Sequence, residues 1–510
     1  MKNYKYIALF LLSLGVMSCE ENTDFDPILE EVKPEVTLST NGLDFSKYVA
    51  VGASFTAGFT DGALFKNAQE NSFPNILATK FKAAGGGDFN QPLMGDNTGG
   101  FVLGSTVVQP PRLVFNPVTS TPVRLDAIPT TSLTSRADGS SFKNYGIPGA
   151  KSFHLTFAGY GTLNPYFGRM ASSAGATVLG DALAQQPTFF TLSEVGGNDV
   201  LGFATSGGSG VDQKNNPDAA SYGPNDITSP LVFNQVFNGM VSALTAGGAK
   251  GVIATVPDIS LLPFFTTVPY NPVPMNEATA TAVNGAYAAY NGGIKQAFGA
   301  LVAGGAMTQA AADAEIAKRT ISFAAGQNAV VIVDEDLTDL GAINPAFAAL
   351  KQLRQTTPED LLVLPSSSFI GTLADPGNPA SVNGVGVALA DNWVLTPEEQ
   401  LAIKTATEAY NTTITNLVNS NNNIALIDLN AILREAANGI KFDSYIMTTG
   451  LVTGGLVSLD GIHLTGRGYA LMANKMLAAI DAKFGSNFTL ATDGLAKADD
   501  YPTNYSPALR

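Results

Sequence analysis

The chain has 510 residues, of which 45% are hydrophobic and 14% are charged, and this composition excludes a globally disordered protein. Its formal net charge of −15, without any cluster of Lys and Arg, argues against nucleic acid as a partner. A single cysteine excludes an internal disulfide and a cysteine-based metal site. Because the chain has only two histidines, His154 and His463, any histidine-dependent chemistry has two candidates.

The N-terminus has the pattern of a signal peptide over residues 1–18. Lys2 and Lys5 precede a short apolar run at 7–16, which is shorter than the roughly 20 residues that span a bilayer. The run ends Val-Met-Ser-Cys, which resembles a bacterial lipobox and predicts lipidation of Cys19; a chance cysteine after an ordinary signal peptide is the alternative. The segment 19–42 is rich in acidic residues and contains proline, which is typical of a tether between an anchor and a folded domain. We therefore expect a membrane anchor through Cys19 in the cell envelope, at the periplasmic or surface face of the outer membrane.

Short apolar runs followed by turn residues predict buried strands at 48–52, 187–195, 250–256, 329–333 and 424–429. Helical stretches lie between several of them, and the sequence at 396–399 (TPEE) is typical of a capped helix start. This alternation predicts an α/β fold with a mainly parallel sheet. We expect the folded domain to span 43–485, with large loop and helical insertions near 94–141 and 258–395 and a polar, loosely packed tail at 486–510.

Four polar motifs follow or lie near these apolar runs, and in parallel sheets ligands bind beyond the carboxyl ends of the strands. Each motif alone has a structural interpretation, such as a helix cap, a tight turn or a surface histidine before a helix. The motifs are GASFTAG at 52–58, NYGIPGA at 144–150, SEVGGND at 193–199 and DGIHLT at 460–465.

Together, in this order, the motifs resemble the blocks of the SGNH/GDSL hydrolase family. The resemblance brackets most of the chain, from Gly52 to His463. It implies a three-layer α/β/α, flavodoxin-like fold. It also implies a serine esterase or lipase that acts on small-molecule or lipid esters, most of all acyl esters, without a cofactor.

The resemblance also implies residue roles. Ser54 would be the nucleophile, His463 the general base, and Asp460 the carboxylate that orients the imidazole. The backbone N–H groups of Ser54 and Gly149 and the side-chain amide of Asn198 would form the oxyanion hole. One departure is plain, because the aspartate of the family's G-D-S motif is Ala53 here.

Alternatives stay open at the level of sequence. Ala53 and the anchor allow a catalytically silent surface lipoprotein that binds a hydrophobic ligand or a membrane partner, and a glycan O-acetyl esterase is the second substrate class. We expect His154 to be structural or to line the pocket, Asp199 to brace its motif, and Asp258 to cap the next element. The spacing of His, Cys, Asp and Glu predicts no metal site.

Overall fold

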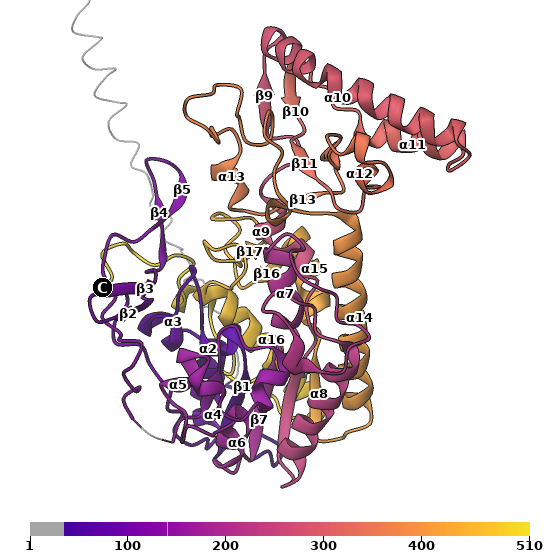
Figure 1. Ribbon diagram of the computed structural model, residues 1–510. Coiled ribbons are helices and arrows are strands. Elements are labelled where there is room, and N and C mark those ends of the chain that lie inside the picture. The colour runs from indigo at the N-terminus through magenta and orange to yellow at the C-terminus, as the bar shows by residue number, and fades with distance from the viewer. Residues whose placement is uncertain (1–34, 140) are drawn as a thin grey trace, which may run out of the picture. The chain divides into compact units, whose positions relative to one another are not determined.

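A sheet of five parallel strands lies at the centre of the fold (Figure 1). Numbered along the chain from one to five, the strands stand in the spatial order 2-1-3-4-5, which is the doubly wound order found in flavodoxin. The predicted α/β class with a parallel sheet is therefore confirmed. From one edge to the other the strands are β6 (Asn144–Gly146), β1 (Tyr48–Gly52), β7 (Phe189–Ser193), β8 (Lys250–Ala254) and β15 (Ile424–Ile427).

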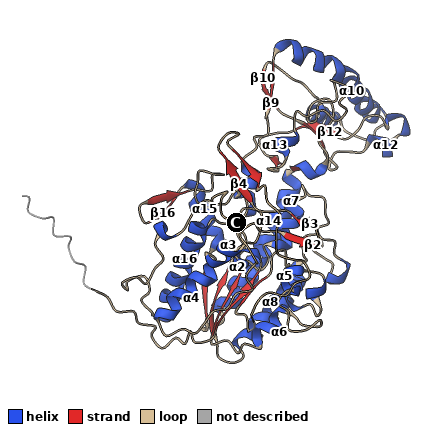
Figure 2. Ribbon diagram, turned by 90° about the vertical axis from the view of Figure 1, so that its left-hand side faces the viewer, coloured by secondary structure: helices blue, strands red, loops and turns tan. Residues whose placement is uncertain are grey.

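Helices cover both faces of this sheet, which explains why its strands are continuous apolar runs (Figure 2). Successive residues of β1 enter opposite apolar clusters: Val49 and Val51 on one face, Tyr48 and Ala50 on the other. The first face packs against α6 (Val178–Leu183), α8 (Pro230–Thr245) and α14 (Pro397–Asn419). The second packs against α4 (Phe73–Ala83) and α16 (Gly466–Phe484).

One predicted strand lies elsewhere. The run at 329–333 forms β11 (Val331–Val333), which pairs antiparallel with β12 (Leu353–Gln355) outside the central sheet. The prediction that it belongs to the parallel sheet was wrong, because an apolar run indicates that a strand is buried but does not indicate which strand it pairs with. The place in the central sheet is taken instead by the edge strand β6, whose three residues, Asn-Tyr-Gly, do not form an apolar run.

The predicted helix caps are confirmed. Thr396 accepts a hydrogen bond from the Glu399 N–H, and the Glu399 carboxylate accepts one from the Thr396 N–H at 2.7 Å, which makes a capping box at the start of α14. Asp258 caps the following short helix η4 (Ile259–Leu261), where its carboxylate accepts a hydrogen bond from the Ser260 N–H at 3.2 Å.

The expected insertions carry small elements of their own. Residues 94–141 contain two hairpins, β2 (Phe101–Leu103) with β3 (Thr106–Gln109) and β4 (Leu113–Asn116) with β5 (Thr121–Arg124). Residues 258–395 bury separate apolar clusters around Val331 and Phe298. The further elements there are α9 (Pro263–Thr266), β9 (Val273–Met275), α10 (Glu277–Ala303), α11 (Gln309–Arg319), β10 (Gly326–Asn328), α12 (Leu340–Ile343), β13 (Leu361–Leu362), α13 (Ser366–Phe369) and β14 (Val394–Leu395).

The tail at 486–510 is packed, so the expectation of loose packing was wrong. Phe488 is fully buried in the core, and the Tyr505 ring lies 4.9 Å from the ring of Phe65. The buried Arg112 guanidinium donates a hydrogen bond to the Ser506 carbonyl at 2.7 Å. Single apolar residues among polar ones therefore pack this segment against the folded domain. Because they are not regularly spaced, the sequence shows no hydrophobic periodicity that would predict this packing.

The computed structural model describes residues 35–139 and 141–510. The compact unit begins at Leu38. The end of the expected tether at 19–42 thus belongs to this unit, and the Ser39 N–H donates to Asn487 Oδ1 at 2.7 Å. The expected signal peptide and Cys19 lie outside the described residues. No helix in the described part is long and apolar enough to cross a membrane.

Candidate active site

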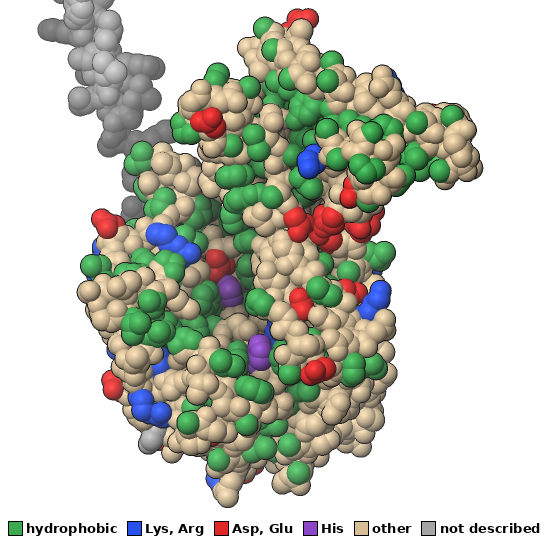
Figure 3. Space-filling model, viewed as in Figure 1, with side chains coloured by type: hydrophobic (Ala, Val, Ile, Leu, Met, Phe, Trp, Pro, Cys, Tyr) green, Lys and Arg blue, Asp and Glu red, His purple; other side chains and the backbone are tan. Residues whose placement is uncertain are grey.

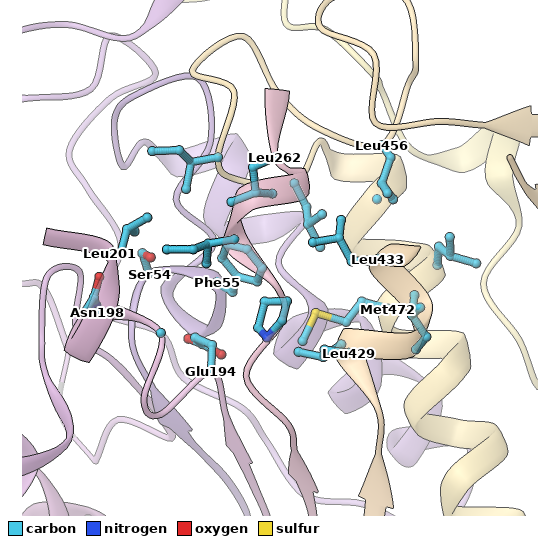
Figure 4. Close-up of a pocket in the computed structure, with 18 residues that line it drawn as sticks. Ser54, Phe55, Glu194, Asn198, Leu201, Leu262, Leu429, Leu433, Leu456 and Met472 are labelled. Atoms are coloured by element: carbon cyan, nitrogen blue, oxygen red, sulfur yellow. The ribbon is translucent and has the colours of Figure 1, made fainter. Parts of the chain in front are cut away.

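A cavity that is open to solvent lies at the carboxyl ends of the central strands (Figure 4). Ser54 follows β1, Asn198 follows β7, Pro257 follows β8 and Leu429 follows β15, and all four line the cavity. The strand order reverses between β1 and β7, so Ser54 and Asn198 flank the topological switch point. Doubly wound folds bind their ligands in this crevice.

Ser54 begins the short helix α2 (Ser54–Ala57) directly after the turn that leaves β1. The described residues offer no hydrogen-bond partner to its hydroxyl or to its backbone N–H. In Figure 4 the side chain lies beside Asn198 at one end of the cavity. Both polar groups of Ser54 are therefore free to meet a ligand.

The carboxylate of Glu194 holds the Ser54 turn in place. Its Oε1 accepts hydrogen bonds from the Ala53 N–H at 2.6 Å and the Thr56 N–H at 2.9 Å, and its Oε2 accepts one from the Thr56 hydroxyl at 3.0 Å. A Cβ on Gly52 would lie 2.9 Å from Oε1 and 2.2 Å from the Thr56 hydroxyl, so this packing requires glycine. The turn thus has an anchor without an acidic side chain at position 53.

Glu194 is only 6% exposed and has a positive φ of 46°, which is unusual for a residue other than glycine. Burial raises the pKa of its carboxyl to about 7, in spite of the hydrogen bonds from Thr56 and Ala53 that favour the anion. Glu194 was not predicted to have a role of its own, although it lies within the third motif. A carboxylate directly after a buried strand, two residues before the Gly-Gly-Asn-Asp run, was the available signal.

His463 and Asp460 form a hydrogen-bonded pair, with Nδ1 and Oδ2 2.8 Å apart. The Asp460 Oδ1 also accepts the N–H groups of Ile462 and His463, both at 2.9 Å. Burial opposes ionisation of Asp460, but the adjacent imidazole and these hydrogen bonds outweigh it and hold its pKa well below the usual range. Because an ionised carboxylate only accepts, Nδ1 carries the proton and Nε2 is left as the base.

The loop that carries this pair is tied to the segment that follows the Ser54 turn. The Gly62 N–H donates to Asp460 Oδ2 at 2.8 Å. The buried Asp61 accepts a hydrogen bond from the Leu459 N–H at 3.0 Å, while its own N–H donates to the Ser458 hydroxyl at 3.0 Å. Asp61 was also missed at the level of sequence, since its partners lie almost 400 residues away.

Aromatic contacts complete the approach of His463 to the Ser54 turn. The His463 ring lies 5.7 Å from the ring of Phe55, the neighbour of Ser54, and 4.6 Å from the ring of Phe59. Both histidines of the chain are visible in a hollow on the face shown in Figure 3. The first and fourth sequence motifs are therefore adjacent in the fold.

The second and third motifs also meet. Asn198 begins α7 (Asn198–Thr205), and its side-chain amide donates to the Ala150 carbonyl at 2.9 Å, which leaves its second N–H free. Gly149 is exposed with a φ of 78°, and its N–H has no partner among the described residues. Since Asn198 binds the residue after Gly149, these two donors are held close together.

Asp199 and His154 have structural roles. The fully buried Asp199 carboxylate accepts hydrogen bonds from the Ser152 N–H at 2.8 Å and the Ser152 hydroxyl at 2.6 Å, and burial raises its pKa. His154 stacks on Tyr160 at 4.6 Å, and its Nδ1 accepts the Lys151 N–H at 3.1 Å. Burial and the nearby Lys151 charge lower the pKa of His154 to about 4, so it is neutral at pH 7. The bracing role expected of Asp199 is confirmed.

No family model, curated protein or solved structure matches the chain.

Apart from Ser54, Glu194 and Asn198, the side chains that line the cavity are almost all apolar. In Figure 4 these three polar side chains lie toward one end of the cavity, and the apolar side chains line the rest of it. Such a lining favours an alkyl chain and offers little to a sugar, which needs many hydrogen-bond partners. Among the apolar residues are Leu201, Leu262, Leu429, Leu433, Leu456 and Met472.

Proposed function

We propose that the protein is a serine ester hydrolase of the SGNH/GDSL type that acts on acyl or lipid esters. The observation that carries the proposal is the Ser54 hydroxyl, which has no hydrogen-bond partner among the described residues and lines an apolar cavity together with Asn198. Its neighbour Phe55 has its ring 5.7 Å from the ring of His463, which is paired with Asp460. The strand order 2-1-3-4-5 and the helices on both faces support the three-layer, flavodoxin-like fold of that family.

In the first half of the reaction, Ser54 Oγ attacks the ester carbonyl carbon while its proton moves to His463 Nε2. The carbonyl oxygen becomes an oxyanion and accepts hydrogen bonds from the N–H groups of Ser54 and Gly149 and from the Asn198 amide. The bond to the alcohol oxygen then breaks, and the alcohol leaves with the proton from Nε2. Asp460 stabilises the imidazolium while it exists.

In the second half, water gives a proton to His463 Nε2 and its oxygen attacks the acyl carbon. The same donors hold the second oxyanion. The bond to Ser54 Oγ breaks, Oγ takes the proton back from Nε2, and the carboxylic acid leaves. The serine hydroxyl is regenerated for the next cycle.

The apolar lining supports acyl over acetyl groups as the favoured substrate class. Each methylene that moves from water into such a cavity contributes about 0.8 kcal/mol. An acyl chain that extends along Leu262, Leu433 and Met472 therefore gains binding energy that an acetyl group lacks. A glycan O-acetyl esterase, by contrast, needs polar partners for the sugar next to the serine.

The test is hydrolysis of p-nitrophenyl esters of increasing chain length by the purified protein. We expect hydrolysis that favours long chains, and Ser54→Ala and His463→Gln should each lower kcat by about 10⁴-fold or more. His154→Gln is the matched control, because it alters the other histidine, which stacks on Tyr160 and has no paired carboxylate among the described residues, and it should stay active. Equal rates for the parent and Ser54→Ala would refute the proposal and favour a silent lipoprotein that binds a hydrophobic ligand.

We further propose that Cys19 is lipidated and anchors the protein in the cell envelope, at the outer membrane. The support is the sequence at 16–19 alone. Metabolic labelling with palmitate should mark the parent and not Cys19→Ala, and fractionation should find the parent with outer membranes. Release of the unlabelled parent into the soluble fraction would contradict the anchor.

A further inference from the structure

Three carboxylates from separate segments converge at the boundary between the second insertion and helix α14. Glu335 follows β11, Asp391 begins the short helix η6 (Asp391–Trp393), and Glu399 lies in the first turn of α14. One carboxylate oxygen of each lies within 4.8 Å of the others. Their positions along the chain have no metal-motif spacing, which is why the sequence predicted no metal site.

Two of these carboxylates carry an oxygen that is buried and unpaired. Glu399 is 7% exposed; its Oε2 accepts the Thr396 N–H of the capping box, but its Oε1 has no partner among the described residues. Asp391 Oδ2 accepts the Ser209 hydroxyl at 2.7 Å, and its Oδ1 is buried without a partner. A buried acceptor that stays unpaired is costly, so two of them in one cluster call for a cation or a shared proton between them.

No ion pair of the described residues joins Lys or Arg to Glu335, Asp391 or Glu399. The buried Arg354 guanidinium is bound instead by Asp334 and, at 2.6 Å, by Asp360. Figure 3 shows acidic side chains gathered where α14 begins in Figure 1.

The cluster is closed by main chain on one side and open on the other. A Cβ on Gly208 would lie 1.6 Å from Glu399 Oε1, and both Gly207 and Gly208 have positive φ, so the loop after α7 packs directly on this carboxylate. Glu335 is exposed on the other side. An ion could therefore enter from solvent past Glu335 and be held against Glu399.

We propose that Glu335, Asp391 and Glu399 bind a calcium ion. A donor set made only of carboxylate oxygens selects a hard cation. Calcium is commonly held by several protein carboxylates in flexible geometry, whereas magnesium keeps most of its waters and takes one or two carboxylates, so three carboxylate oxygens within 4.8 Å of one another favour calcium. The bound ion ties the insertion loops to helix α14 on the sheet, whether or not Ser54 catalyses ester hydrolysis.

The first experiment uses the full folded chain after treatment with EDTA. We expect calcium in the millimolar range to raise the thermal unfolding midpoint, with a dissociation constant on the order of 10⁻⁴ M. Trp393 is the only tryptophan of the chain and lies two residues from Asp391. Terbium bound at the site should therefore emit when the tryptophan is excited, and calcium should compete this emission away.

Variants assign the effect to the cluster. Glu399→Gln and Asp391→Asn should each weaken calcium and terbium binding at least tenfold. In Glu399→Gln the amide carbonyl can still accept the Thr396 N–H, and loss of repulsion should leave its unfolding midpoint in EDTA equal to or above that of the parent. Glu398→Gln is the matched control, since Glu398 is exposed beside Glu399 but outside the cluster, and it should bind as the parent does.

Several outcomes would overturn the proposal. If calcium leaves the parent midpoint unchanged and terbium shows no sensitised emission, the carboxylates share protons instead of an ion. If Glu398→Gln weakens binding as much as Glu399→Gln, the effect is general surface charge. If magnesium stabilises the parent more than calcium does, the assignment to calcium is wrong.

Discussion

Replacement of Glu194 by glutamine tests how the Ser54 turn is anchored. In Glu194→Gln the amide carbonyl can still accept the N–H groups of Ala53 and Thr56, and the Thr56 hydroxyl can turn to accept from the amide. The substitution therefore keeps the hydrogen bonds to the Ser54 turn but removes the carboxyl group that titrates. Glu194→Ala instead leaves two buried N–H groups unpaired, at a cost of about 1–3 kcal/mol each.

The pH dependence of this substitution follows from the raised pKa. A carboxyl whose pKa rises from 4.5 unfolded to about 7 folded gives stability that is complete below 4.5 and is lost as pH rises through 7. Each tenfold change in proton affinity is worth about 1.4 kcal/mol, so the full loss is on the order of 3 kcal/mol. Burial of Glu194 leaves little solvent screening to reduce this figure.

The assay is urea unfolding of the parent and Glu194→Gln at about pH 5 and about pH 8. The free energy of unfolding of the variant, relative to the parent, should rise by about 2.5 kcal/mol between these two pH values, because part of the full loss already occurs below about pH 5. Asp61 also has a pKa raised to about 7 by burial, but it is present in both proteins and cancels in the difference. A difference between variant and parent that is the same at both pH values would refute the reasoning.

Further predictions concern the reaction itself. Asp460→Asn should keep the fold but lower kcat for p-nitrophenyl esters by about 10⁴-fold, because Nδ1 loses the acceptor that fixes its proton; a loss under tenfold would exclude the triad role. Asn198→Ala should lower kcat by about 100- to 1000-fold with little change in KM, and a change in KM alone would place Asn198 in substrate binding only. Leu433→Trp should fill part of the cavity and lower kcat/KM for palmitoyl esters at least tenfold while acetyl esters are unaffected; an equal loss for both would show general damage to the site.

The class of the fold was predictable because burial leaves a local trace. Strands β1, β7, β8 and β15 are buried on both faces and therefore appear as apolar runs. The edge strand β6 is too short to leave such a run, and β11 leaves one without joining the central sheet. The packed tail around Phe488 was unpredictable because its anchors lie far away in sequence.

The candidate site was predictable only where its residues stand in compact motifs. Short motifs that are visible in the sequence contain Ser54, Asn198 and His463, and the structure brings the segments that carry these motifs together. Glu194 and Asp61 carry the contacts that join those segments, yet each is a single carboxylate whose partners are set by tertiary packing. The cluster at Glu399 was hidden for the same reason.

The central claim is that Ser54 is a nucleophile activated by His463, and the reaction of the folded protein with a fluorophosphonate tests it most directly. Intact mass and peptide mapping should find one adduct, on Ser54, and His463→Gln should slow its formation at least a hundredfold while His154→Gln labels at the parent rate. Folded parent protein that takes up no probe, or that is labelled at another residue without regard to His463, would contradict the account.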